Sequence, residues 1–425
     1  MRVLLIYVVT ENINIPVLPL GMACIAAATE NAGHAVRQIS LTAAHAPSDL
    51  KAMLADFHPD AIGLSLRNVD DQKMENTQFL LGAVKTVVSV CRSLSDAPLI
   101  LGGAGYSIFP RSALAYLEAD MGIQGEGEAA FVKLLARLEQ KYDLKGIPGL
   151  YLPESDHHQA IGKLNDPVAF PLPLPNRHLQ LPNAVGEQKT MIPFQTGRGC
   201  PMNCNYCSTS AIEGVTPRHY PVAGIVASLA RYVAAGFKHF FFVDNTFNLP
   251  RKHAAAICDG ITAAGFDISW QCILYPWHVD EALVEKMARA GCTDVSLGFE
   301  SGSEKILEIM NKRYRPEEVR QVSELLKRYG IRQMGFLLLG GPGETRETVE
   351  ESLIFADSLA LNAIKITLGI RIYPNTTLAA TAIEDGIIAP DQDLLFPAFY
   401  LVPDLADWLR ETIRNWCDSR PHWIF

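Results

Sequence analysis

Short apolar runs alternate with amphipathic segments along the first part of the chain. The apolar runs have the length of strands, and in the segments between them the apolar positions recur every three or four residues, as in helices. The runs lie at 2–8, 34–41, 61–66, 97–103 and 121–125, and the helical segments at 20–33, 48–57, 77–94, 112–119 and 128–140. This alternation predicts an α/β domain over residues 1–140, a doubly wound parallel sheet covered by helices on both faces. Such sheets bind ligands at the carboxyl ends of their strands.

A second alternating series spans residues 191–380. Its apolar runs lie at 191–197, 239–245, 268–274, 294–300, 332–340 and 364–374, with helical patterns between them. Six strand–helix units predict a partial (β/α)6 barrel of the TIM type, with its chemistry at the carboxyl ends of the strands. The proline-rich residues 141–190 are interpreted as a linker with one hairpin. Residues 381–425 predict a short extension with a helix at 403–416.

Composition and charge argue against several classes of protein. The formal net charge of −9 and the pI near 5.7 argue against binding of duplex nucleic acid, which usually requires a basic face. No stretch offers the roughly 18 uninterrupted apolar residues of a membrane span. The N-terminus lacks the pattern of a signal peptide, so a cytoplasmic location is expected. Six of the nine cysteines stand singly among apolar residues, which is typical of buried, inert thiols.

The other three cysteines form the sequence "GCPMNCNYC". Cys200, Cys204 and Cys207 follow the first barrel strand with C-x3-C-x2-C spacing. Thiolates are soft ligands for iron–sulfur clusters, zinc or copper(I). Three thiolates on a four-iron cluster leave one iron open, as a reactive metal site requires. Zinc with His219 as a fourth ligand, or three unliganded thiols, are the alternatives.

The segment "GRGCPMNCNYCS" resembles the signature loop of the radical S-adenosylmethionine (SAM) superfamily, including the aromatic Tyr206 before the last cysteine. The resemblance implies that the three cysteines hold a [4Fe-4S] cluster. It also implies that the amino and carboxylate groups of SAM chelate the open iron. One electron, from a donor such as flavodoxin or ferredoxin, would then cleave SAM to methionine and a 5′-deoxyadenosyl radical.

Further segments at the ends of predicted strands resemble other motifs of this superfamily. They are "FVDNTF", "SLGFESGS", "GFLLLGGPGET" and "RIYPNTTL". The resemblance implies contacts to SAM by Tyr206 of the cysteine loop and, in these further segments, by Asp244, Asn245, Glu300, Ser301, Gly340, Gly341 and Pro342. Taken singly, Asp244 also fits a helix N-cap, and the glycines fit a tight turn. Tyr275 and Trp277, after the third strand, fit either a substrate pocket or packing at the barrel end.

The N-terminal segments "PDAIGLSLRN", "LILGGAGYS" and "GIQGEGE" resemble the Rossmann-like cobalamin-binding domain that precedes many radical enzymes. The resemblance implies a cobalamin site formed by Ser65, Leu66, Arg67, Gly102, Gly103, Gly105, Tyr106, Gly125, Glu126, Gly127 and Glu128. The D-x-H-x-x-G motif of related domains is absent, so cobalamin would bind base-off without a histidine ligand. The alternative is a flavodoxin-like domain that retains only the fold.

Together these resemblances imply a cobalamin-dependent radical SAM methyltransferase. One SAM would methylate cobalamin, and a second would give the radical that activates an unactivated carbon of a small-molecule or amphiphilic substrate. That carbon would then take the methyl group from methylcobalamin. A radical cyclase or ring-rearranging enzyme with the same cofactors is one alternative. A methylthiotransferase-like enzyme and a non-catalytic cobalamin or cluster sensor are the others.

Overall fold

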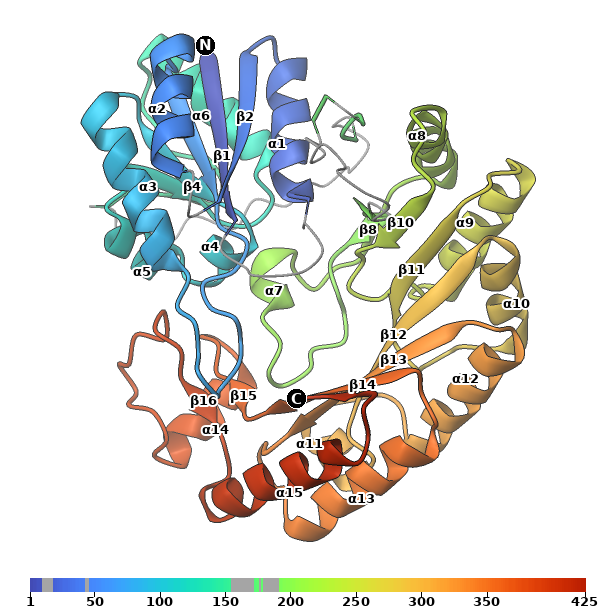
Figure 1. The fold of residues 1–425 in the computed structure, drawn as a ribbon. Helices are drawn as coiled ribbons and strands as arrows, with labels where there is room; N and C mark the ends of the chain where they lie inside the picture. The colour runs from blue at the N-terminus through green and yellow to red at the C-terminus, as the bar shows by residue number, and fades with distance from the viewer. Residues whose placement is uncertain (10–17, 43–45, 154–171, 176, 179–190) are drawn as a thin grey trace.

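The computed structural model describes residues 1–9, 18–42, 46–153, 172–175, 177–178 and 191–425 of the 425-residue chain. Each half of the chain forms one large sheet (Figure 1). Among the described residues, no helix combines the length and the apolar character needed to cross a membrane.

The first sheet confirms the predicted doubly wound fold. Its strands are β1 (Arg2–Val9), β2 (Ala35–Thr42), β3 (Ala61–Ser65), β4 (Leu99–Gly102), β5 (Met121–Ile123) and β6 (Leu150–Tyr151). Their order is β2-β1-β3-β4-β5-β6, and β1 to β5 are parallel. The strand order reverses at β1, because β2 pairs on one side of it and β3 on the other. Sheets of this kind open a ligand crevice at such a reversal, beyond the carboxyl ends of the strands.

Alternation along β1 divides the core of this half into two layers, because successive side chains of a strand point to opposite faces. Leu4 and Ile6 pack with α2 (Ala46–Phe57), α3 (Leu81–Leu94) and α5 (Pro110–Leu117). Val3 and Leu5 pack on the other face, with α1 (Leu20–Asn31) and α6 (Glu128–Gln140). The buried positions of β1 therefore require helices on both faces.

The first sheet extends beyond residue 140, where the sequence predicts a linker to begin. Strand β6 pairs antiparallel with β5, Gly122 opposite Tyr151 and Ile123 opposite Leu150. Residues 154–171 and 179–190, which make up most of the predicted linker, lie outside the described residues.

The second sheet contains all six predicted barrel strands. They are β7 (Ile192–Phe194), β10 (His239–Phe242), β11 (Ser269–Leu274), β12 (Cys292–Glu300), β13 (Arg332–Leu339) and β14 (Ala363–Leu368). A seventh strand, β17 (Trp423–Ile424), pairs with β14 from the C-terminal tail. All of these strands are parallel, in the order β17-β14-β13-β12-β11-β10-β7. The predicted partial barrel is thus confirmed, with one edge strand that the sequence analysis did not predict.

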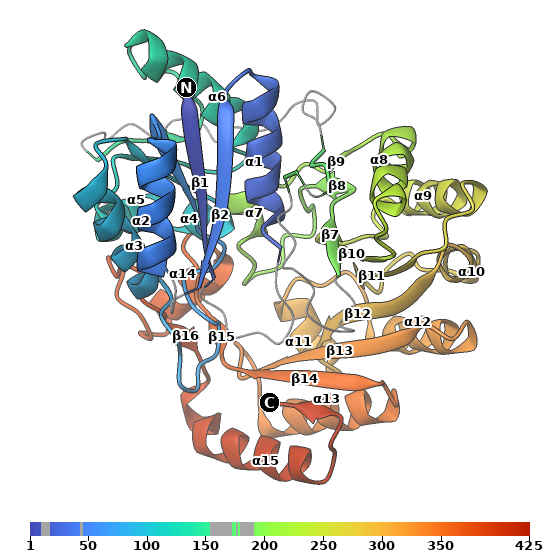
Figure 2. The ribbon, with the colours of Figure 1, turned by 45° about the horizontal axis from the view of Figure 1, so that its top comes forward.

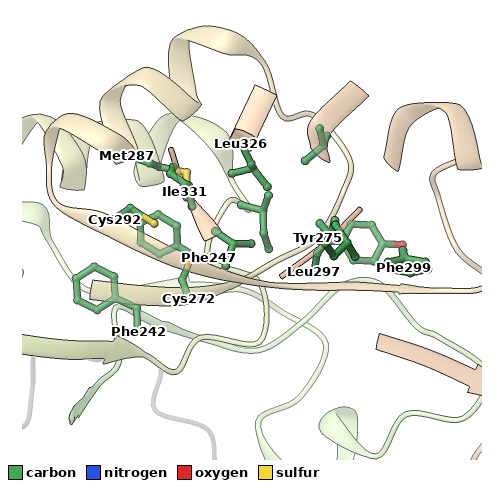
Figure 3. Close-up of a cluster of buried hydrophobic side chains, with 14 of the residues drawn as sticks. Phe242, Phe247, Cys272, Tyr275, Met287, Cys292, Leu297, Phe299, Leu326 and Ile331 are labelled. Atoms are coloured by element: carbon green, nitrogen blue, oxygen red, sulfur yellow. The ribbon is translucent and has the colours of Figure 1, made fainter. Parts of the chain in front are cut away.

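Helices cover the outer face of this curved sheet (Figures 1 and 2). They are α8 (Val222–Ala234), α9 (Arg251–Ala263), α10 (Glu281–Arg289), α12 (Pro316–Arg328) and α13 (Arg346–Ser358). Figure 3 shows Cys272 and Leu297 of the sheet among the same buried side chains as Met287 of α10 and Leu326 of α12. Along β11 only alternate residues are buried. The other face of the sheet is therefore left for the functional site.

The sixth predicted strand, 364–374, is interrupted at Gly369. This residue has a φ of +69°, and a Cβ atom there would lie 2.5 Å from the sulfur of Met74. The chain leaves the large sheet and forms β15 (Ile370–Arg371), which pairs antiparallel with β16 (Phe399–Tyr400). The prediction of one continuous strand is therefore wrong, because the turn depends on a glycine within an apolar run.

The segment that includes β15 and β16 joins the two halves of the molecule. Arg371 donates to Asp70, of the loop after β3, with Nε and Oδ2 2.9 Å apart, and neither side chain is more than 4% exposed. The Phe79 and Phe396 rings are in contact, with centroids 4.8 Å apart. Between these two strands lies α14 (Thr377–Glu384), and after β16 comes α15 (Ala406–Asp418). The predicted extension thus contacts the N-terminal half through Phe396, and its predicted helix corresponds to α15.

Candidate functional site

The cysteine loop lies at the carboxyl end of β7. Short β8 (Gly197–Arg198) pairs antiparallel with β9 (Arg218–His219), and the three cysteines and α7 (Thr209–Ile212) lie between them. Gly199 has a φ of +84°, and a Cβ atom there would lie 2.3 Å from the carbonyl oxygen of Thr216. Only glycine permits this close approach, which begins the turn into Cys200.

The donor set of this loop fits an iron–sulfur cluster. Burial raises the pKa values of Cys200 and Cys204, and at Cys204 the nearby Lys312 ammonium opposes the rise. In the described part of the chain, no three His, Cys, Asp or Glu side chains are gathered as ligands for a single metal ion. His219 instead has Nε2 3.3 Å from the carbonyl oxygen of Leu249. Because the cysteines of a cluster bind different irons, they need not converge on one point.

Lys312 lies between two residues predicted to contact SAM. Its Nζ donates to the Tyr206 hydroxyl at 2.9 Å and lies 3.4 Å from Oε1 of Glu300, and its side chain is 4% exposed. Burial alone would lower the pKa of Lys312, but Tyr314, Glu300 and Tyr206 raise it well above its usual range. The ammonium therefore stays charged. No pattern in the sequence identifies this residue, because a lysine after α11 (Glu304–Ile309) matches no strand-end motif.

Asp244 supports the backbone that leads into the cysteine loop. Its Oδ1 accepts from the backbone N–H groups of Thr196, at 2.9 Å, and Gly197, at 2.6 Å. Burial raises the pKa of Asp244 to about 7, although these two hydrogen bonds oppose the rise. The N-cap interpretation is wrong, because the next helix, α9, begins at Arg251. Asp244 thus holds a strand end in place.

Asn245 and the unpredicted Glu213 act on the same loop. Asn245 Nδ2 donates to Oε2 of Glu213 at 2.6 Å, and the same oxygen accepts from the backbone N–H of Gly199 at 3.0 Å. Oε1 of Glu213 accepts from Gln195 at 2.8 Å. Glu213 lies beyond the cysteines in an irregular segment, so nothing in the local sequence distinguishes it. These contacts fix the backbone immediately before Cys200.

Ser301 and the glycine motif are placed by buried hydrogen bonds. The Ser301 hydroxyl lies 2.8 Å from that of Ser352 on α13, and it accepts from the backbone N–H of Ser303 at 3.1 Å. Its side chain therefore holds the loop after β12. Gly340 and Gly341 direct their N–H groups to Glu344, and Pro342 follows in the same turn, half-buried. Burial raises the pKa of Glu344 to about 7. The tight-turn interpretation of the motif is therefore confirmed in geometry.

Tyr275 lies beside Lys312, and Trp277 lies further along the same loop. The Tyr275 hydroxyl accepts from the backbone N–H of Arg313 at 3.0 Å, and its ring centroid is 5.9 Å from Lys312 Nζ. The Arg313 guanidinium lies 5.5 Å from the Trp277 ring centroid. Tyr275 is 6% exposed and packs with Tyr314, so its placement fits barrel-end packing as well as a pocket wall.

A cavity of about 390 Å³ opens at the carboxyl edge of the first sheet. This volume is in the usual range for small-molecule and cofactor sites. Of the residues predicted for cobalamin, the cavity is lined by Ser65, Arg67, Gly102, Gly103, Gly125, Glu126, Gly127 and Glu128. A Cβ atom on Gly102 would meet no protein atom within 4 Å, so this glycine leaves space inside the cavity. A large, mostly flat ligand fits such a glycine-walled opening.

Three residues predicted for cobalamin do not line the cavity. Leu66 is 2% exposed, and its carbonyl oxygen accepts from the N–H of Gly105 at 2.9 Å. A Cβ atom on Gly105 would lie 3.0 Å from the carbonyl oxygen of Arg67. Tyr106 is fully buried and lies where a side chain on Gly122 would be. These three residues lie behind the cavity wall and shape the end of the sheet. Their predicted contact with cobalamin stays a prediction.

The two glutamates of the "GEGE" loop face the cysteine loop. Oε1 of Glu128 accepts from Arg198 at 2.6 Å, and Oε2 of Glu126 accepts from Arg218 at 2.6 Å. Arg198, Gln195 and Glu213 also line the cavity from the side of the cysteine loop. The two candidate cofactor sites therefore share a wall.

A glycine-walled cavity beside a three-cysteine loop fits an α/β enzyme that binds more than one cofactor. The B12 binding domain model matches residues 6–135, and the radical SAM superfamily model matches residues 194–356. The chain therefore belongs to the radical SAM enzymes that also carry a B12 binding domain. Cobalamin and a [4Fe-4S] cluster are bound in a solved structure of TsrM from Kitasatospora setae, which is similar to this chain.

Relatives are similar over most of the chain. An uncharacterized methyltransferase of Pyrococcus horikoshii is 29% identical over 385 residues, which cover 87% of this chain and 79% of the relative. The tryptophan 2-C-methyltransferase of Streptomyces laurentii is 24% identical and covers 89% of this chain and 74% of its own length. The solved structure of TsrM from Kitasatospora setae with tryptophan and a SAM analogue has a TM-score of 0.83, with 21% identity, over 98% of this chain and 88% of TsrM.

Proposed function

We propose that the protein is a methyltransferase that uses cobalamin and radical SAM chemistry to methylate an unactivated carbon of a small-molecule substrate. The observation that carries the proposal is the shared wall, where Arg198 and Glu213 of the cysteine loop line the glycine-walled cavity. Two cofactors that act on one substrate must lie close together, and holding them so is a main contribution of a protein to such chemistry. Several similar curated proteins are named methyltransferases, which supports the proposal.

Each part of the site has a role in this proposal. Cys200, Cys204 and Cys207 would hold the cluster, and the glycine walls of the cavity would hold cobalamin without a histidine ligand. When bound, the cluster supplies the electron that cleaves SAM, and cobalamin carries the methyl group. Tyr206 and Tyr275 both pack around Lys312, next to Cys204, where they would limit the access of water to the cluster. Asp244 and Glu213 orient the loop backbone through the hydrogen bonds described above.

The surroundings of such an enzyme must be reducing. All nine cysteines are free thiols in the structure, a state typical of proteins in the cytoplasm. We therefore propose the cytoplasm as its location and a flavodoxin or ferredoxin as its electron donor.

The test compares the wild-type chain with Cys204→Ala and, as a matched control, Cys417→Ala, which changes a half-buried cysteine outside the loop. After anaerobic reconstitution we expect about four irons per chain in the wild type and the control, and a loss of cluster in Cys204→Ala. With cobalamin, SAM and a low-potential reductant, the two intact proteins should form both 5′-deoxyadenosine and S-adenosylhomocysteine. Formation of 5′-deoxyadenosine alone would contradict methyl transfer and favour the cyclase alternative. An unchanged iron content in Cys204→Ala would contradict the cluster assignment.

A further inference from the structure

Two arginines face each other across the short β8–β9 ribbon. Arg198 pairs with Arg218 in the antiparallel register, so two guanidinium groups lie on adjacent strands next to the cysteine loop. Like charges directly opposite each other on a ladder repel. This arrangement therefore needs negative partners, which the ribbon itself lacks.

The "GEGE" loop before α6 supplies these partners. Arg198 contacts both carboxylates, with Nη2 2.6 Å from Oε1 of Glu128 and Nη1 3.7 Å from Oε1 of Glu126. Arg218 Nη1 donates to Oε2 of Glu126 at 2.6 Å, and its Nη2 donates to the backbone oxygen of Glu213 at 2.7 Å. None of the four ion-paired side chains is more than 11% exposed. Two positive and two negative groups therefore neutralise one another inside the protein.

This network touches both cofactor sites. Glu126, Glu128 and Arg198 line the cavity, so a ligand that fills the cavity contacts the same side chains. Arg198 also stands two residues before Cys200, and Arg218 and Glu213 hold the far end of the same loop. A change in this network would therefore alter the shape of the cavity wall and the position of the cysteine loop together.

The chemistry of the network favours orientation over stability. A buried ion pair often contributes no more stability than apolar side chains of similar size, because both charges lose their hydration. Arginine, however, presents several donors in a fixed plane, so its contacts to two carboxylates define an angle as well as a distance. Glu126 and Glu128 thus have a task that does not require them to contact cobalamin directly.

We propose that Arg198 is a positioning residue that couples the cobalamin cavity to the SAM site, by holding the cysteine loop against Glu126 and Glu128. Occupancy of the cavity orders the cavity wall, and the ordered wall fixes the loop that carries the cluster. Coupling between two binding sites is reciprocal, so cobalamin tightens SAM binding by the same factor by which SAM tightens cobalamin binding. The inference rests on the two cofactor sites and is independent of methyl transfer.

The decisive variant removes both charges of the strongest pair, as Arg198→Met with Glu128→Met. Removing only one partner would leave a buried charge without compensation and risk unfolding, whereas removing both avoids this. Arg198→Lys is the conservative variant, which retains the charge and loses the planar contacts. Arg332→Met is the matched control, because Arg332 forms an exposed ion pair with Asp294 in the same sheet as β7.

The measurements are dissociation constants on the cluster-containing chain without reductant, so no turnover occurs. SAM binding is titrated with and without hydroxocobalamin, and hydroxocobalamin binding with and without SAM. In the wild type and in Arg332→Met, the presence of each cofactor should lower the dissociation constant of the other at least about fivefold, and this ratio is the coupling factor. In the double variant this factor should fall to about one, with the iron content and the melting temperature retained, and Arg198→Lys should lie between.

Retention of the full coupling factor in the double variant would overturn the proposal, as would its absence from the wild type. If the double variant does not fold, Arg198→Lys decides, and an unchanged factor in it would again overturn the proposal. These experiments measure only binding. A chain that binds both cofactors with full coupling but transfers no methyl group would therefore refute the proposed function and leave this inference valid.

Discussion

Gly102→Val should block the cobalamin site while sparing the fold. Gly102 is the last residue of β4 and lines the cavity, and a Cβ atom there would meet no protein atom within 4 Å. Valine suits the extended backbone of a strand. Its side chain would therefore be accommodated without a clash in the apo protein, in space that the cofactor needs.

The size of the loss in cobalamin affinity follows from the cost of overpacking the cavity. Extra methyl groups forced into a filled site cost about 1–3 kcal/mol. Since about 1.4 kcal/mol corresponds to a tenfold change in an equilibrium constant, the Kd for cobalamin should rise about 5- to 150-fold. Absorbance titration of the apo chain with hydroxocobalamin measures this, and thermal unfolding of the apo chain should show an unchanged Tm.

The neighbouring glycine provides the contrast. Gly103 has a φ of +98°, and a Cβ atom there would lie 2.5 Å from the carbonyl oxygen of Leu66. Gly103→Ala should therefore lower the Tm, because the strain falls on the fold itself. If Gly102→Val bound cobalamin with the Kd of the wild type at an unchanged Tm, the cofactor would not occupy this cavity, and the reasoning would fail.

Three further predictions concern buried charges. Lys312→Met removes the cation beside Cys204, so the cluster should be harder to reduce, by about tenfold in the reduced-to-oxidised ratio at a fixed potential; an unshifted potentiometric EPR titration would contradict this. The folded state favours the protonated form of Glu344, because burial raises the pKa of its carboxyl from 4.5 to about 7. Between about pH 5 and about pH 8 the wild type should therefore lose about 2–3 kcal/mol relative to Glu344→Gln, and a constant difference in urea unfolding would refute the raised pKa. Asp70→Asn leaves a buried arginine without its partner and should cost about 3–5 kcal/mol in urea unfolding, whereas Asp294→Asn, in an exposed pair, should cost under about 1 kcal/mol; equal losses would contradict this.

The large elements of the fold could be predicted because each has its own period of apolar positions. The six barrel strands, β7 and β10 to β14, alternate with helices whose apolar faces are evident in the sequence. The short strands β6, β8, β9 and β17 could not be predicted, because two residues carry no periodicity. The break at Gly369 was missed for another reason. Its apolar neighbours resemble a strand, and only contact with Met74 of the other half shows that the chain must turn there.

The site shows the same division between local and tertiary signals. The cysteine loop could be predicted, because its three cysteines stand within eight residues of one another. Lys312 and Glu213 could not, because each acquires its role from side chains that lie far away in sequence or belong to another element. Glu126 and Glu128, which the sequence predicts to contact cobalamin, line the cavity. The ion pairs to Arg198 and Arg218, however, depend on how the two halves meet.

Two of the contacts between the halves differ in kind and in place. At the β15–β16 segment, Asp70 and Arg371 form a buried pair within an apolar contact that includes Phe79 and Phe396. Beside the cofactors, the contact is the network centred on Arg198. The first contact fixes how the halves are oriented, and the second fixes one loop within that orientation. Asp70→Asn should therefore lower stability with little change in the coupling between cobalamin and SAM, whereas the Arg198 and Glu128 double variant should lose the coupling at nearly unchanged stability. If both changes altered stability and coupling in the same proportion, the two contacts would act as one unit, and Arg198 would have no separate positioning role.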